Sequence, residues 1–159
     1  MRHRRPERRG LRAVIGLLAF AWLLLPCDCA AASGLRDFTS DGCSLFPDGD
    51  FKDRALWCDC CFGHDIAYWR GGTAEERLKA DEKLRDCVLE HTKDGALAGL
   101  MFRGVRAGGH PVFPNWYRWG YGWKYGRGYK PLTDDEQHQA AEKLEDYLKK
   151  HPEGYCGTK

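Results

Sequence analysis

WCDCCFGHDIAY, from Trp57 to Tyr68, is the stretch of sequence around which the rest of the chain is expected to be arranged. On a helix of 3.6 residues per turn, Cys60, His64 and Tyr68 lie at i, i+4 and i+8 and form one stripe. Asp65 points about 100° away from His64 around the helix axis, so it is not expected to orient the imidazole. A carboxylate so placed suits a hard cation such as calcium.

The N-terminal residues 1–32 have the pattern of a secretory signal peptide. A basic segment precedes an apolar run from Ala13 to Leu25, and small residues follow at 30–32. This run is too short to span a bilayer of about 30 Å. Cys27 resembles a lipidation site, but Pro26 stands where a small residue is wanted, so we favour cleavage. We therefore expect a secreted protein, either periplasmic or extracellular.

The charge balance after cleavage argues against nucleic acid as a partner. The leader carries six of the 25 basic residues and two of the 23 acidic ones, which leaves 19 basic and 21 acidic residues. No basic block remains in that part of the chain. Residues 33–159 are long enough for a single domain with one modest core, and we expect a monomer.

Six cysteines remain after the leader: Cys43, Cys58, Cys60, Cys61, Cys87 and Cys156. In an exported chain they suggest three disulfides, chosen from fifteen pairings. The alternative is a zinc site, since C-x-C-C-x-x-H packs four possible ligands together. The spacing differs from the usual C-x-x-C knuckle, and the compartment favours oxidation, so we prefer disulfides.

Two helices are expected around this stretch. The first should begin near Arg54 and end at Gly71-Gly72, because glycine adopts the left-handed conformation that ends many helices. Thr73 and Glu76 form a capping box, which predicts a second helix over 74–91. The tight connection predicts an antiparallel pair.

The remaining elements are less regular. Residues 96–107 predict a short helix weakened by glycine, and Thr133 with Glu136 predicts a C-terminal helix to Lys150. Asp81 lies beside the apolar side of the second helix, where a carboxylate is usually exposed and inert unless something pairs with it.

Aromatic residues alternate with others in the segment before the C-terminal helix: Tyr117, Trp119, Tyr121, Trp123 and Tyr125. This period of two predicts a strand or hairpin edge. Such rings suit a lipid interface or a sugar surface, and they equally suit the core of a small protein.

The motif C-C-x-x-H-D-x-x-Y at Cys60–Tyr68 resembles the secreted phospholipase A2 family. In that family a loop cysteine precedes the histidine helix, and the second helix carries an aspartate six residues before a cysteine. Cys43, Asp81 and Cys87 match those positions. The resemblance covers about forty-eight residues, from Asp41 to Val88.

The resemblance implies a mainly α fold: a disulfide-stapled antiparallel helix pair with a calcium loop, followed here by an aromatic-rich irregular or β segment and a C-terminal helix. It implies that His64 is the catalytic base, Asp81 its partner, Tyr68 part of the supporting hydrogen-bond network and Asp65 a calcium ligand. The implied disulfides, with the last taking the cysteines that the first two leave, are Cys43–Cys61, Cys60–Cys87 and Cys58–Cys156. Ala67 and Ala80 stand where animal members have a further cysteine pair, so both halves of that bridge are missing together.

The segment DGCSLFPD at 41–48 is more similar to bacterial and fungal members than to the glycine-rich loop of animal ones. Carried over, the Asp41 side chain and the Gly42 carbonyl join Asp65 on calcium. Taken without the resemblance, the same residues are ordinary surface turns.

The activity implied is calcium-dependent hydrolysis of the sn-2 ester of glycerophospholipids in a membrane or micelle. The alternative is a non-catalytic exported binding module that uses the aromatic segment 113–129 on a membrane or cell wall. It predicts a misplaced metal loop and no effect of His64→Gln.

Overall fold

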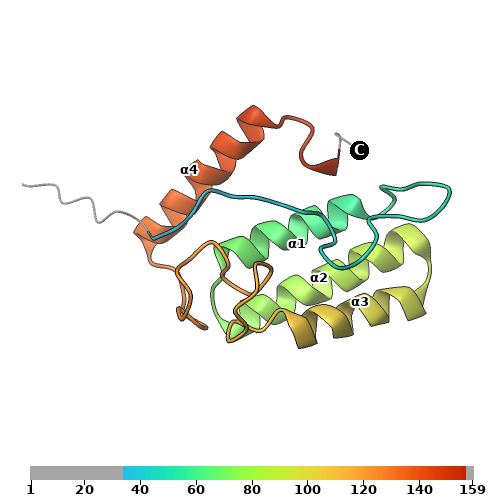
Figure 1. Cartoon of the computed structure of the whole chain (residues 1–159), viewed down its shortest axis with the longest axis horizontal. Helices are drawn as coiled ribbons and strands as arrows, with labels where there is room; N and C mark the ends of the chain where they lie inside the picture. Colours follow the sequence, from blue (N-terminus) through green and yellow to red (C-terminus); the bar gives the residue numbers. More distant parts are fainter. Residues whose placement is uncertain (1–33, 157–159) are drawn as a thin grey trace, which may run out of the picture.

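The computed structural model describes residues 34–156, and four helices lie within that range (Figure 1). They are α1 Cys58–Arg70, α2 Ala74–Thr92, α3 Gly95–Gly108 and α4 Asp134–Lys150. The expectation of a mainly α chain is confirmed for these residues, which contain no strand. The expected signal peptide at 1–32 lies outside them. Within 34–156, none of the helices combines the length and apolar character needed to cross a membrane.

Both predicted capping boxes are present. The Thr73 hydroxyl accepts the Glu76 N–H and the Glu76 carboxylate accepts the Thr73 N–H, and Thr133 with Glu136 repeats the arrangement. The prediction that α1 begins near Arg54 is wrong. It begins at Cys58, because the chain before it forms turns.

Helix α2 packs against both α1 and α3, and the three lie side by side in Figure 1, with α4 on the far side of α1. Cys60 of α1 is bonded to Cys87 of α2, whereas Tyr68, two turns further along α1, contacts Arg77 near the start of α2. Residues early in α1 therefore contact residues late in α2, and residues late in α1 contact residues early in α2.

Three disulfides cross-link this arrangement: one joins α1 to α2, and the other two join the preceding loop and the C-terminal tail to α1. Their members are Cys43–Cys61, Cys58–Cys156 and Cys60–Cys87, the same pairs that the resemblance implies. The six sulfurs are bonded in three pairs, so none is free to bind zinc, and the zinc alternative is wrong. His91 lies beside the Cys60–Cys87 pair, but those sulfurs are not free to bind metal.

The aromatic segment is irregular, so the strand or hairpin edge predicted there is wrong. Its backbone partners belong to the end of α1, where Gly120 N–H donates to Tyr68 O at 2.6 Å and Gly122 N–H donates to Trp69 O at 3.1 Å. A Cβ on Gly122 would lie 2.5 Å from the Trp69 ring, so glycine permits this approach. The segment thus covers the C-terminal carbonyls of α1, which helices leave without intrahelical partners.

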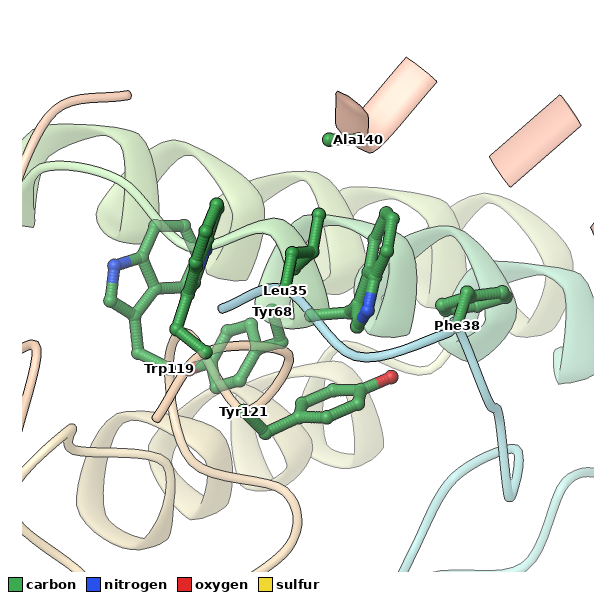
Figure 2. Close-up of a cluster of buried hydrophobic side chains, with 8 residues drawn as sticks. Leu35, Phe38, Tyr68, Trp119, Tyr121 and Ala140 are labelled. Carbon is green, nitrogen blue, oxygen red and sulfur yellow. The ribbon is translucent and has the colours of Figure 1, made fainter. Parts of the chain in front are cut away.

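Alternate aromatic rings of this segment are buried. Trp119, Tyr121 and Trp123 join a cluster with Leu35, Phe38, Tyr68, Trp69 and Ala140 of α4 (Figure 2). Two indoles also donate to carbonyls at and just after the end of α1: Trp123 Nε1 to Arg70 O at 2.7 Å and Trp119 Nε1 to Gly72 O at 2.9 Å. For these three rings the core interpretation is correct, whereas Trp116 and Tyr125 are exposed.

Candidate functional site

His64 and Asp81 face one another between α1 and α2. His64 Nε2 lies 2.8 Å from Asp81 Oδ1, and the two side chains are 9% and 0% exposed. The Cys60–Cys87 disulfide joins the same two helices one turn before His64, which helps fix this pairing. Asp65, the next residue along α1, contacts Ser40 instead of the imidazole.

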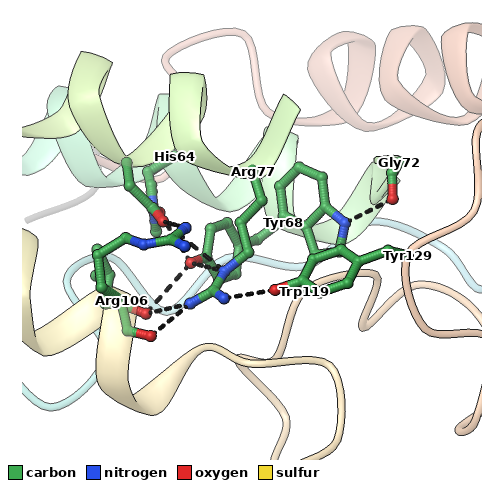
Figure 3. Close-up of polar contacts among 9 residues, drawn as sticks. His64, Tyr68, Gly72, Arg77, Arg106, Trp119 and Tyr129 are labelled. Atoms are coloured by element: carbon green, nitrogen blue, oxygen red, sulfur yellow. Dashed lines mark hydrogen bonds and ion pairs between the residues drawn. The ribbon is translucent and has the colours of Figure 1, made fainter. Parts of the chain in front are cut away.

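A hydrogen-bond network that includes His64, Tyr68 and Arg106 holds Asp81 in place (Figure 3 labels these three residues). The Tyr68 hydroxyl donates to Asp81 Oδ1 at 2.8 Å, and Arg77 Nε donates to the Tyr68 oxygen at 3.0 Å. Arg106 of α3 donates to Asp81 Oδ2 at 2.7 Å, and Arg77 Nε lies 3.7 Å from the same oxygen. Asp81 is therefore a buried carboxylate matched by two arginines and a phenol.

Neither arginine was predicted from the sequence. Arg77 lies four residues before Asp81 on α2, a spacing that places the two side chains on one helix face. This spacing can be read from the sequence alone. Arg106 comes from α3 and shares no local pattern with Asp81, so only the packing of α3 on α2 brings it there.

The electrostatics favour an ionised Asp81. Burial opposes ionisation, but the hydrogen bonds from His64 and Arg106 outweigh it and hold the pKa of Asp81 below its ordinary value. Burial raises the pKa of Tyr68, which keeps its hydroxyl protonated and able to donate. A carboxylate only accepts, so a neutral His64 donates from Nε2 and keeps the Nδ1 lone pair free to take a proton.

His64 lines a cavity of about 280 Å³. Five large apolar side chains of its lining come from the loop before α1 and from α3: Leu45, Phe46, Leu100, Met101 and Val105. Asp65 and Tyr68 also reach it. The cavity therefore offers a basic ring nitrogen beside an apolar space, as small-molecule sites often do.

Asp65 lies in a region of excess negative charge. Its side chain is buried, and its Oδ2 accepts a hydrogen bond from Ser40 Oγ at 2.6 Å. Burial raises the pKa of Asp65 to about 7, and the charges of Asp41 and Asp48 add to the rise. No ion pair joins Asp65 to a basic residue within the described range. A buried acid with acidic neighbours is the arrangement that a bound cation would relieve.

Asp41 and Gly42 lie in the loop before α1, near Asp65. Asp41 is exposed, and its two oxygens accept from Ser44 Oγ at 2.9 Å and from Trp116 Nε1 at 3.1 Å. Gly42 is buried with φ +75°, and a Cβ there would lie 2.2 Å from Asp48 Oδ1. This close approach requires glycine at 42.

The carboxylates of this loop and Asp65 do not by themselves form a tight metal cage. Among residues 34–156, Asp41, Asp48 and Asp65 are not a set whose ligand atoms all lie within 4.8 Å of one another. Calcium also accepts backbone carbonyls and water, so the donor chemistry fits it, with carbonyl oxygens required to complete its shell.

Comparisons with protein-family models, with curated proteins and with solved structures gave no match for this chain. Any functional assignment therefore depends on the residues and geometry described above.

Proposed function

We propose that this chain is a secreted calcium-dependent phospholipase A2, which hydrolyses the sn-2 ester of glycerophospholipids. The observation that carries the proposal is the 2.8 Å contact between His64 Nε2 and the buried Asp81, at the wall of an apolar cavity. It gives one imidazole a fixed orientation and leaves its second nitrogen for chemistry.

In this mechanism His64 Nδ1 takes a proton from the water that attacks the ester carbonyl, as a general base. Asp81 holds the ring and stabilises the imidazolium that forms. Tyr68, Arg77 and Arg106 keep Asp81 ionised and in position. No serine or cysteine nucleophile is needed, which is consistent with six cysteines that are all disulfide-bonded.

The residues that would hold calcium are Asp65, Asp41 and the Gly42 carbonyl. When bound, calcium supplies positive charge that polarises the ester carbonyl and offsets the charge of the oxyanion and the phosphate. The raised pKa of Asp65 supports this assignment, since its cause is burial near two other acids.

The cavity supports a lipid substrate. Its apolar walls suit an acyl chain, and two of its lining residues are also exposed to solvent, Leu45 at 75% and Leu100 at 50%. Trp116, which bonds Asp41, is 65% exposed. These side chains would contact a membrane or micelle at the cavity mouth.

The test is hydrolysis of phospholipid vesicles with calcium, with a chelator, and by Asp65→Asn with calcium. We expect turnover with calcium, and its loss in both other arms. Asp59→Asn, an exposed position on the same helix, is the matched control and should retain activity.

Vesicle binding with no hydrolysis under any condition would contradict the proposal and favour the binding module. That alternative has less support, because three of the alternating rings are buried.

A further inference from the structure

A second cavity, of about 480 Å³, is lined by positively charged side chains and lies apart from the His64 cavity. The two share no lining residue. Arg36, Arg118 and Lys124 line the second cavity, and none of its eight lining residues is acidic. Three cations facing one hollow repel one another unless an anion lies between them.

Arg118 is the most buried of the three, at 5% exposed. Its guanidinium donates to Gly120 O at 2.6 Å and to Trp123 O at 2.7 Å, and stands over the Tyr125 ring at 5.6 Å. Within residues 34–156 no carboxylate pairs with it. Burial lowers the pKa of Arg118, and the nearby charge of Arg36 lowers it further. Carbonyl dipoles stabilise this buried charge but do not neutralise it.

The other groups of the lining are similarly unmatched. Arg36 donates to Tyr121 O and, like the exposed Lys124, forms no ion pair with an acid in the described part of the chain. Asn115 Oδ1 is buried with no hydrogen-bond partner there. A phosphate-type oxyanion supplies the negative charge that these cations lack.

We propose that the cavity of Arg36, Arg118 and Lys124 binds a phosphate-type oxyanion, with the phosphate of an anionic lipid headgroup as its source. Pro114 and Asn115 of the lining belong to the segment 112–116, whose Val112, Phe113 and Trp116 are 59%, 41% and 65% exposed. Apolar side chains that enter a membrane surface would bring a cationic cavity beside them to the depth of the lipid phosphates. The site requires no hydrolysis and is independent of the proposed activity.

The experiment measures binding of the full-length mature protein to vesicles of ether-linked phosphatidylcholine, with and without ether-linked phosphatidic acid. Ether lipids contain no carboxylic ester, so hydrolysis at the sn-2 position cannot affect the result. Lys124→Gln should weaken binding to the anionic vesicles about fivefold, and Lys124→Arg should restore it. Lys83→Gln is the matched control, because this exposed lysine on α2 makes the same charge change away from the cavity. It should change binding less than about twofold.

A second arm titrates inorganic phosphate and follows tryptophan fluorescence, since Trp123 lines the cavity. Saturable phosphate binding that is weakened by Lys124→Gln and competes with anionic vesicles supports the lipid source. The same binding with no preference for anionic vesicles supports the oxyanion site but assigns it to soluble phosphate. Equal losses in Lys124→Gln and Lys83→Gln, or no saturable phosphate binding, would overturn the proposal.

Discussion

Asp81 of α2 and Asp65 of α1 are both buried carboxylates, but only Asp81 is matched by positive charge among the described residues. Arg77, Arg106 and His64 surround Asp81 and hold its pKa below the ordinary value. Asp65 has a serine hydroxyl and two acidic neighbours, and its pKa rises to about 7. Positive side chains of the described residues therefore complete the His64–Asp81 centre but not the Asp65 centre, and this difference is the basis of the calcium site that we propose.

The largest expected change in stability is in the Asp81 centre. Asp81→Asn should lower the free energy of unfolding by about 3–5 kcal/mol, because Arg77 loses a buried countercharge. Urea denaturation measures the effect. Asp86→Asn, whose partner Arg85 is partly exposed, should change it by less than about 1 kcal/mol. Equal effects of the two substitutions would mean that Asp81 is not the better matched carboxylate.

Asp65→Asn should have the opposite effect on the free energy of unfolding in calcium-free buffer. The folded-state pKa of Asp65, about 7, lies above its ordinary value of 3.8, so the folded state binds this proton more tightly than the unfolded state. Stability due to this group is present below pH 4 and is lost as pH rises through 7. At pH 8, Asp65→Asn should therefore raise the free energy of unfolding, on the order of 2 kcal/mol. A loss of stability at pH 8 would contradict this interpretation of the Asp65 centre.

The stabilisation of the protein by calcium should depend on pH through Asp65. Protonation of Asp65 competes with a cation, so the rise in melting temperature on adding calcium should be larger at pH 8 than at pH 5. Differential scanning calorimetry of the native protein and of Asp65→Asn checks this. Asp65→Asn should show little response at either pH, and a full response would remove Asp65 from the proposed calcium site.

A smaller effect is expected at Arg106, a positioning residue that acts through Asp81. Arg106→Gln removes one charge-assisted hydrogen bond from Asp81 Oδ2 and should lower kcat/KM about tenfold. Loss of this positive charge favours the imidazolium, so the acidic limb of the pH–rate profile should move to higher pH. Arg103→Gln, an exposed arginine on the same helix, should change neither quantity.

The sequence was informative where local geometry decides the outcome. Helical spacing places His64 and Tyr68 on one stripe and directs Asp65 elsewhere, and the capping boxes at Thr73 and Thr133 mark the starts of α2 and α4. These features depend on neighbours a few residues apart, which the chain itself specifies.

The rest depends on contacts between distant segments. The alternating rings suggested a strand, but their backbone and indole donors bond the last carbonyls of α1 instead of a neighbouring strand. Arg106 and Arg118 had no sequence signal, because packing of α3 and of the aromatic segment gives each of them its partners. Periodicity does not report which carbonyl or carboxylate will lie opposite a side chain.

The most direct test uses a phospholipid with a labelled sn-2 chain and calcium, and compares the native protein with His64→Gln and His91→Gln. His64→Gln removes the proposed base and should lower release of the sn-2 fatty acid by about 10²–10⁴-fold, while the exposed His91 should be replaceable without loss. Release that is unchanged in His64→Gln, or that comes from the sn-1 chain, would contradict the proposal that the His64–Asp81 pair activates water at the sn-2 ester.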